Sequence, residues 1–313
     1  MRSDIARAAK ILCGGGLVAF PTETVYGLGA DAANEKAIKR LYAVKRRPAD
    51  HPVIVHFADA EKAFAWAREV PAAARKLAAR FWPGPLTLIL KRSTLAKDFV
   101  TGGQDTVGLR VPSHPVAREL LNAFGGAIAA PSANRFGLVS PTTAAHVRDD
   151  LGSDVDFVLE GGASEVGIES TILDLSGPSP VLLRPGHVSR EQLREVLGVE
   201  ILEKAVASPR HPGGMERHYS PRTPAQLVFS YELDKTIAQA KGQVAVLAFS
   251  RPDERVDYWL RMPREPKAYA QRLYAALREL DTADCERILI EAPPESPEWS
   301  AVRDRLKRAC GEA

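Results

Sequence analysis

The stretch Phe20–Asp31, FPTETVYGLGAD, decides how the N-terminal part of this chain is interpreted. The apolar run Gly16–Phe20 predicts a buried strand, which ends at Pro21. Hydroxyls, a carboxylate and the glycines Gly27 and Gly29 follow it. Glycine lets backbone approach a ligand closely or adopt a positive φ, so the stretch predicts the floor of a polar pocket. Taken alone, an ordinary strand and turn explain the segment equally well.

Composition and charge set broad limits on the protein. The chain has 313 residues, of which 45% are hydrophobic and 26% charged, as in ordinary globular proteins of one or two domains. The net charge of +3 permits contact with anions but does not predict a nucleic-acid surface. We expect no membrane segment or signal peptide. The three cysteines are scattered, which argues against disulfides or a zinc site and predicts a reducing, cytoplasmic location.

The chain divides into three parts by pattern. Residues 1–202 alternate between strand and helix patterns, which predicts an α/β domain built round a sheet. Residues 203–223 have no periodicity and carry three prolines and two adjacent glycines, which indicates a linker. Residues 224–313 resume the alternation and predict a smaller α/β domain.

Hydrophobic periodicity predicts the individual elements. Helices are expected at Asp4–Leu12, Glu35–Val44, Ala60–Arg68, Pro71–Ala79, Pro115–Ala123, Thr142–Arg148, Arg190–Val196, Ala268–Leu280 and Trp299–Ala309. Strands are expected at Leu17–Phe20, Val53–His56, Leu86–Leu90, Val107–Val111, Ala127–Ala130, Phe157–Leu159, Thr171–Leu175, Val181–Arg184, Gln226–Ser230, Gln243–Phe249 and Arg287–Glu291. Ser140 or Thr142 is expected to cap the helix at Thr142–Arg148.

Two polar segments suggest nucleotide contacts. Lys45, Arg46 and Arg47 close a predicted helix before Pro48, where cations either complement the helix dipole or clamp a polyphosphate. In Ala129–Pro141, AAPSANRFGLVSP, hydroxyl and amide side chains follow a strand end. Ligands of open α/β sheets bind beyond the carboxyl ends of strands, although an Asx-type turn explains the same residues without a ligand.

Arg110 and Arg184 each interrupt an apolar strand pattern near its end. Because a buried arginine needs an anionic partner, each predicts either an internal carboxylate or a bound carboxylate or phosphate. Known signatures are missing: the sequence has no Walker loop, no G-x-G-x-x-G, no H-E-x-x-H and no G-x-S-x-G. It therefore offers no covalent nucleophile and no metal-ligand pattern.

Nine segments together resemble the threonylcarbamoyl-AMP synthase family, the YrdC-like proteins, in its longer two-domain form. They are FPTETVYGLGAD, VKRRP, HPVIVH, FWPGPLTLIL, VGLRVPSHP, APSANRFGLVSPT, ESTILDL, LLRPG and PGGMERHYSPRTP, in the order of the family. The family's K-x-R and S-x-N hallmark corresponds to Lys45, Arg47, Ser132 and Asn134. The resemblance implies a twisted mixed sheet with a positive cavity, followed by a smaller Rossmann-like α/β domain.

The resemblance also implies an activity. L-threonine, bicarbonate or CO2, and ATP with Mg2+ would give L-threonylcarbamoyladenylate and pyrophosphate, and a separate transferase complex would use the product to modify tRNA next to the anticodon. The implied threonine site is Thr24, His56, Arg110, Ala130 and Ser170. The implied ATP site is Lys45, Arg47, His51, Thr106, Ser132, Asn134, Ser140, Arg184 and Tyr219, with charge stabilisation by Lys45, Arg47 and Arg184. The linker that carries Tyr219 is expected to act as a lid.

The chain departs from the family in three places. The linker reads PGGMERHY where PGM followed by other residues is usual, but its length is preserved, so Tyr219 still aligns. His51 stands where asparagine is common, so its contact with ATP is expected through the backbone. The segment APPESPEWSAVRDRL lacks the glycine-rich turn usual near the C-terminus. Two other functions stay open at this point: a carbamoyl transferase that works through carbamoyl-adenylate, and an RNA-binding module without enzymatic activity.

Overall fold

The computed structural model describes residues 2–203 and 208–311, which form two compact units. Unit 1 comprises the residues up to Phe136, Pro141–Glu165 and Glu169–Gly214. Unit 2 comprises Gly137–Ser140, Val166–Ile168 and the residues from Met215 onward. The chain thus passes to the second unit inside the predicted linker 203–223, of which residues 204–207 lie outside the described part.

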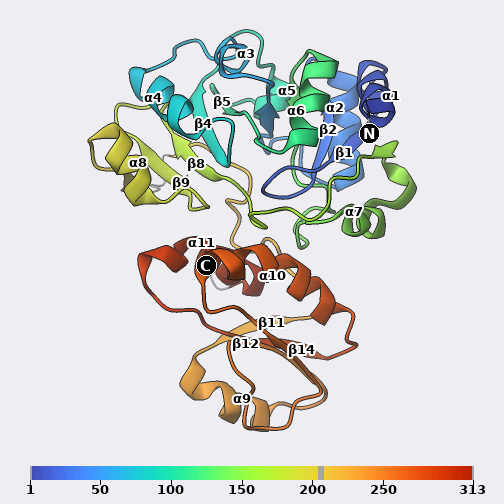
Figure 1. The fold of residues 1–313 in the computed structure, drawn as a ribbon, viewed down its shortest axis with the longest axis vertical. Helices are drawn as coiled ribbons and strands as arrows, with labels where there is room; N and C mark the ends of the chain where they lie inside the picture. The colour runs from blue at the N-terminus through green and yellow to red at the C-terminus, as the bar shows by residue number, and fades with distance from the viewer. Residues whose placement is uncertain (1, 204–207, 312–313) are drawn as a thin grey trace. The chain divides into compact units, whose positions relative to one another are not determined.

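Unit 1 is built on a mixed sheet (Figure 1). Within the described residues the sheet has ten strands in the order β10-β9-β8-β4-β5-β3-β6-β2-β1-β7. The strands are β1 Val18–Phe20, β2 Gly27–Asp31, β3 Ile54–His56, β4 Leu86–Lys91, β5 Thr106–Arg110, β6 Ile128–Ala129, β7 Phe157–Val158, β8 Thr171–Asp174, β9 Val181–Arg184 and β10 Leu202–Glu203. β3 is parallel to β5, whereas β6 is antiparallel to β3.

Eight α-helices of unit 1 lie within the described residues. They are α1 Arg2–Cys13, α2 Glu35–Lys45, α3 Ala60–Phe64, α4 Ala72–Phe81, α5 Asp98–Thr101, α6 Pro115–Phe124, α7 Ala144–Leu151 and α8 Arg190–Leu197. Local side chains fix several of their ends: Asn34 caps α2, and Ser189 with Gln192 forms a capping box on α8. Thr143 caps α7, so the expected cap at Ser140 or Thr142 is wrong.

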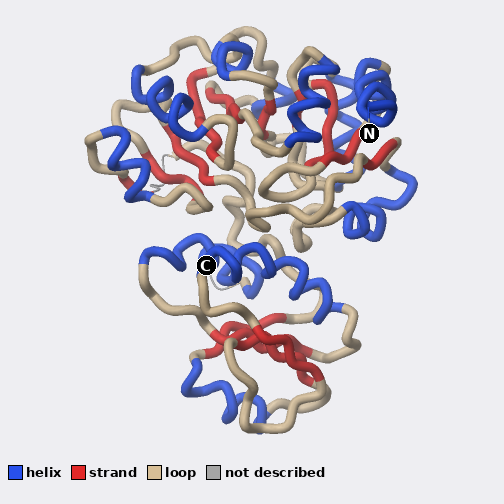
Figure 2. Tube along the Cα trace, viewed as in Figure 1, coloured by secondary structure: helices blue, strands red, loops and turns tan. Residues whose placement is uncertain are grey.

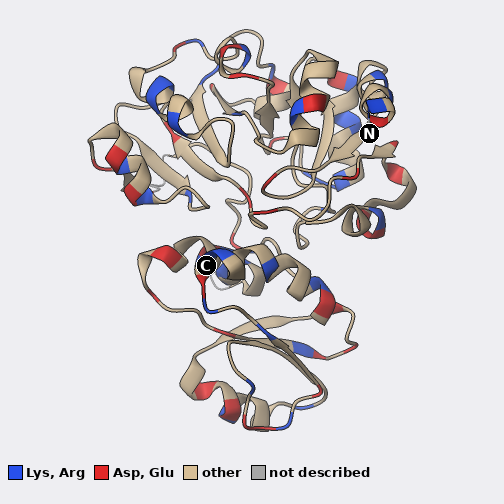
Figure 3. Ribbon diagram, viewed as in Figure 1, with Lys and Arg blue, Asp and Glu red and all other residues tan. Residues whose placement is uncertain are grey.

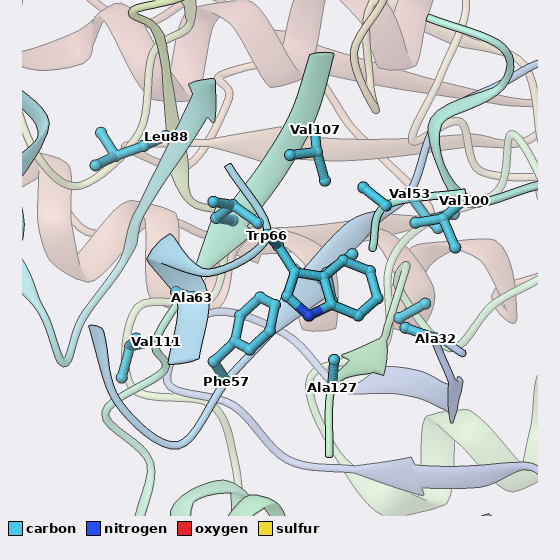
Figure 4. Close-up of a cluster of buried hydrophobic side chains, with 14 of the residues drawn as sticks. Ala32, Val53, Phe57, Ala63, Trp66, Leu88, Val100, Val107, Val111 and Ala127 are labelled. Carbon is cyan, nitrogen blue, oxygen red and sulfur yellow. The ribbon is translucent and has the colours of Figure 1, made fainter. Parts of the chain in front are cut away.

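The main core of unit 1 lies on one face of the sheet. Figure 4 shows Trp66 beside Phe57, with Val107, Val53 and Val100 around them. The two aromatic rings pack edge to face, with their centroids 5.6 Å apart. On the opposite face, α1 and α6 cover the end of the sheet that contains β1 and β6. Burial on both faces explains why these strands appear as continuous apolar runs in the sequence.

Unit 2 is a smaller α/β domain. Within residues 208–311 it has a parallel four-stranded sheet in the order β11-β14-β12-β13. Its strands and α-helices are β11 Ala225–Val228, α9 Leu233–Gln239, β12 Val244–Ala248, β13 Tyr258–Arg261, α10 Pro266–Asp281, β14 Arg287–Glu291 and α11 Ser300–Cys310. In Figure 2 the strands of this sheet lie between α9 on one face and α10 and α11 on the other.

Both signs of charge are spread over the helices of each unit (Figure 3), in keeping with the small net charge of +3. No helix within residues 2–203 or 208–311 is both long and apolar enough to cross a membrane. The fold class predicted from the sequence, a mixed-sheet α/β domain followed by a smaller α/β domain, is confirmed.

The glycines of FPTETVYGLGAD were predicted to adopt a positive φ or to let the backbone approach a ligand, but they pack neighbouring strands instead. Gly27–Asp31 forms β2, which pairs with β1, and neither Gly27 nor Gly29 has a positive φ. A Cβ on Gly29 would lie 2.9 Å from both Ile128 and Phe20, and a Cβ on Gly27 would lie 3.3 Å from the Cβ of Ala130. These glycines therefore allow neighbouring strands and the Phe20 ring to pack closely.

Candidate active site

Arg110, the last residue of β5, is held in place by two other segments of unit 1. Its Nη2 donates hydrogen bonds to Oε1 of Glu23 at 2.8 Å and to Oγ1 of Thr24 at 3.0 Å. Its Nε donates to the carbonyl of Gly84 at 3.4 Å. Arg110 and Glu23 are only 4% and 3% exposed, so the internal carboxylate that the sequence left as an alternative is present. Nη1 makes no hydrogen bond within the described residues and is available to a ligand carboxylate.

The turn after β1 places Glu23 and Thr24 at this position. Oγ1 of Thr22 accepts from the backbone N–H groups of Thr24 and Val25, both at 3.2 Å, which is a hydroxyl-based turn. The second carboxylate oxygen of Glu23 accepts from the N–H of Ser113 at 3.1 Å. Both oxygens of Glu23 are therefore satisfied, and its charge is matched by Arg110.

His56 ends β3 directly beside Arg110, its partner in the parallel pairing of β3 with β5. The side chain is 3% exposed, and its Nδ1 has no hydrogen-bond partner within the described residues. Burial, together with the charge of Arg110, lowers the pKa of His56 to about 3. The imidazole is therefore neutral at pH 7 and offers an unpaired ring nitrogen next to the guanidinium.

Ser170 connects this region to the second arginine. Its hydroxyl lies 2.8 Å from Oγ1 of Thr87, in β4. Arg184, at the end of β9, donates from Nη2 to the Ser170 hydroxyl at 3.2 Å and from Nε to the Ser170 carbonyl at 3.0 Å. Since Arg110 is anchored at Gly84, just before β4, the two arginines flank the same end of that strand.

Lys45 is buried rather than exposed at the end of α2. It is 1% exposed, and its Nζ donates to the carbonyls of Ser132 and Asn134, both at 2.5 Å. Burial, reinforced by the charge of Arg47, lowers the pKa of Lys45 well below its usual value. The contacts join the two halves of the predicted K-x-R and S-x-N hallmark in space.

Arg47 and His51 lie beside Phe136. The guanidinium of Arg47 is 5.3 Å from the centre of the Phe136 ring, and the ring of His51 meets it edge to face at 5.5 Å. Nη2 of Arg47 donates to the carbonyl of Pro52 at 2.8 Å. Arg46 ends α2 in a left-handed conformation with φ of 54°, which turns the chain after Lys45.

The predicted strand residues of unit 1 share a face of the sheet rather than an edge. Thr106 and Arg110 are four residues apart in β5, so their side chains lie on the same face of the sheet. Strand pairing places His56 on that face too, and Ala130, directly after β6, lies on the same face. Because β6 is antiparallel to β3, and β3 is parallel to β5, Arg110 at the end of β5 and Ser132 after β6 lie at opposite ends of the strands. The rule that ligands bind beyond the carboxyl ends of parallel strands therefore does not explain how these residues could share a site. We call this surface the site face.

The middle of the site face is apolar. Ile54, Ile89, Ile172 and Leu183 form a small buried cluster separate from the main core. Gly108 lies between them, and a Cβ there would come within 3.2 Å of Ile89 and 3.5 Å of Ile54. A surface of this kind supports an organic ligand between the polar groups at its margins.

The described end of the linker within unit 1, residues 208–214, is bound to the same domain. Nη1 of Arg184 donates to the carbonyl of Pro212 at 3.0 Å. The carbonyl of Arg210 accepts a hydrogen bond from Nε2 of Gln104 at 3.1 Å, and the N–H of Arg210 donates to Oε1 of Gln104 at 2.7 Å. Nη2 of Arg210 donates to the carbonyl of Gly102 at 2.8 Å. This segment therefore connects Arg184 to the loop that precedes Thr106.

Two of the predicted ATP residues belong to unit 2. Ser140 is buried, and its carbonyl accepts from Nε of Arg278 at 3.5 Å. Tyr219 has a φ of 61° and packs against Tyr274, with the guanidinium of Arg305 5.4 Å from its ring centre. The role of Tyr219 as part of a lid stays a prediction.

Glu23 is the functional residue that sequence reasoning left without a role. The available signal was the arginine inside the apolar strand pattern of β5, which requires an anion, together with the carboxylate of Glu23 just after the predicted strand that ends at Phe20. No cluster of three or more His, Cys, Asp or Glu side chains that would hold a metal ion occurs within the part of the chain that the structure describes.

Comparisons with known proteins identify the family of the chain. Residues 10–186 match the Sua5/YciO/YrdC family model, described as telomere recombination, and residues 188–311 match the model of the threonylcarbamoyl-AMP synthase C-terminal domain. The threonylcarbamoyl-AMP synthase of Pyrococcus abyssi is 40% identical, over 97% of this chain and 93% of the relative. That of Bacillus subtilis is 38% identical, over 98% and 93%. A crystal structure of P. abyssi Sua5 complexed with L-threonine has a TM-score of 0.93 at 39% identity and covers 98% of this chain and 94% of that one.

Proposed function

This chain belongs to the threonylcarbamoyl-AMP synthase family, and we propose that it converts L-threonine, bicarbonate or CO2, and ATP into L-threonylcarbamoyladenylate and pyrophosphate. The observation that carries the proposal is the series of buried polar contacts from Glu23 and Arg110, past the start of β4, to Ser170 and Arg184. One end of that series suits an amino acid, and the other suits a phosphate.

The amino acid would bind at Arg110. The free Nη1 of this residue is suited to the threonine carboxylate, while Glu23 and Thr24 hold the other arm of the guanidinium. Neutral His56 lies beside it and would accept or donate a hydrogen bond without adding charge. Thr24, Ala130 and Ser170 would complete the threonine site. The P. abyssi relative crystallised with L-threonine supports this substrate.

The nucleotide would bind at three cationic side chains of unit 1. Lys45, Arg47 and Arg184 would offset phosphate charge, with Mg2+ entering on the triphosphate as part of the substrate. His51, Thr106, Ser132, Asn134, Ser140 and Tyr219 are the further residues assigned to ATP. The lowered pKa of Lys45 in the free protein would rise as phosphate charge approaches, because an anion stabilises the ammonium.

The reaction would need positioning and charge stabilisation rather than a covalent enzyme intermediate. The threonine amine, once deprotonated, adds to CO2 and forms a carbamate. A carbamate oxygen then attacks the α-phosphorus, the bond between the α- and β-phosphates breaks, and pyrophosphate leaves. The cations would stabilise the charge that develops on the phosphates, and the site face would hold the two reactants in line.

The test is pyrophosphate release by the purified chain with ATP, Mg2+, bicarbonate and L-threonine. We expect release that requires both threonine and bicarbonate, with L-threonylcarbamoyladenylate as the other product. Release with carbamoyl phosphate but not with threonine would instead indicate a carbamoyl transferase. The similarity to HypF, at 20% identity and a TM-score of 0.50, shows the fold alone and does not favour that reaction.

The product would act as an activated intermediate. Its mixed anhydride would donate the threonylcarbamoyl group to tRNA adenosine next to the anticodon in a step carried out by a separate transferase complex. This chain would then have little need to bind tRNA directly, and its net charge of +3 fits that division of labour.

A further inference from the structure

The sheet of unit 2 contains a topological switch point between β11 and β14. These strands are parallel neighbours, with Val228 paired to Glu291 at their carboxyl ends. β11 continues into α9, whereas β14 continues into α11, and the two helices cover opposite faces of the sheet (Figure 1). Leu233 and Ile237 of α9 pack on the face that carries Val228 and Leu289, while α11 packs on β11 from the other face. Open parallel sheets bind ligands beyond the carboxyl ends of strands at such a point.

A cavity of about 230 Å³ lies at this position. Leu227 and Phe229 line it from the end of β11, and Pro293 lines it from the segment after β14. Arg303 and Lys307, one turn apart on α11, form its cationic side. Topology and cavity therefore identify the same place by independent observations.

The lining indicates what the cavity would bind. Lys307 is exposed, and Arg303 forms a 2.8 Å ion pair with Glu295, which also lines the cavity, so the lining has one cationic charge in excess. Phe229 is 53% exposed and stacks on Tyr231, which is 80% exposed, with 5.6 Å between ring centres and 9° between planes. Exposed, stacked aromatic rings bind the faces of nucleobases, and paired Lys and Arg side chains bind phosphate.

We propose that this cavity is a second ligand site of the protein, one that takes a nucleoside monophosphate. The phosphate would lie between Arg303 and Lys307, and the base would stack on Phe229. The volume is below the 300–1,000 Å³ usual for drug-sized ligands, so a dinucleotide is too large and the base is only partly enclosed. The site lies wholly within unit 2 and does not depend on the activity proposed for unit 1.

The test is photolabelling of the full chain with 8-azido-AMP, followed by tryptic mapping. Because Phe229 and Tyr231 lie together in the tryptic peptide Thr223–Lys235, label at this site is separable from label in unit 1. We expect saturable label on this peptide that AMP displaces and adenosine displaces much less. Absence of label there, label that does not saturate, or equal displacement by adenosine would overturn the proposal.

Variants test the residues assigned to the site. The double variant R303Q/K307Q should lower labelling of this peptide by about tenfold or more, and F229A should lower it similarly. Y258A is the matched control, because Tyr258 is an exposed aromatic residue on β13, at the other edge of the same sheet. Unchanged melting temperature and unchanged labelling of unit 1 would show that the variants fold. Equal labelling of the double variant and the wild type would contradict the assignment.

Discussion

Oε1 of Glu23 lies 2.8 Å from Nη2 of Arg110, and both side chains are almost completely buried in unit 1. The pair leaves Nη1 of the arginine uncommitted within the described residues. Glu23 lies in the turn between β1 and β2 and is unremarkable by sequence alone, yet here it orients the arginine that is proposed to bind substrate. Glu23 is therefore both a stabilising and a positioning residue.

Removal of the Glu23 carboxylate should destabilise the protein. E23A would leave the buried Arg110 without its counter-charge, and we expect a loss of about 3 kcal/mol in the free energy of unfolding. Urea denaturation measures this change. E160A is the control, because Glu160 pairs with Arg148 on the surface, and its loss should cost less than about 1 kcal/mol. Equal effects of the two substitutions would contradict the assigned role of Glu23.

Substitution of Arg110 should separate the two substrates. R110A removes the group proposed for the threonine carboxylate, and a charged hydrogen bond of about 1.5–3 kcal/mol corresponds to a rise of roughly 10- to 150-fold in the KM for threonine. The KM for ATP should change little. Steady-state kinetics on a variant shown to be folded checks this expectation, and equal rises for threonine and ATP would rule out the assignment.

Binding of ATP should be accompanied by proton uptake. Lys45 has a lowered pKa in the free protein, and bound phosphates should raise it, so affinity for ATP should fall as the pH rises above the lowered value. Calorimetry over a series of pH values, in two buffers of different ionisation enthalpy at each, measures the protons taken up per ATP. K45M should abolish the uptake. The same uptake in the variant would assign it to another group.

His56 should make the protein sensitive to acid. The unfolded chain gains a proton near the ordinary histidine pKa of about 6.5, whereas the folded pKa is about 3, so stability is lost as the pH falls between these values. The contribution approaches about 1.4 kcal/mol per pH unit between pH 6 and pH 4. H56N should flatten the dependence of unfolding free energy on pH in this range. An unchanged slope would mean that His56 is not buried in the neutral form.

Much of the sheet could be predicted because its strands are short apolar runs bounded by Pro, Gly or charge. β3, β5 and β9 were expected within one residue of their observed ends, and Arg110 and Arg184 were singled out from them. β2 was missed because Gly27 and Gly29 obscure its strand pattern, and their purpose is close packing against other strands. α9, with only two buried residues, carries too little periodicity to be detected.

Spatial relationships between distant segments were the harder part. Lys45 was expected at a helix end, but its burial was not foreseen: the Ser132–Asn134 turn lies against it and supplies two carbonyl acceptors. The resemblance to a family paired these segments, whereas periodicity contains no information about long-range contacts. The partner of Arg110 could not be predicted either, because an arginine in an apolar strand pattern indicates that an anion is needed but not which one.

The most direct measurement is a crystal structure of the full chain with L-threonine and a non-hydrolysable ATP analogue. We predict the threonine carboxylate within hydrogen-bonding distance of Nη1 of Arg110, and phosphate oxygens on Lys45, Arg47 and Arg184. Threonine bound away from Arg110, or a triphosphate that contacts none of these three cations, would contradict the proposed single site for both substrates.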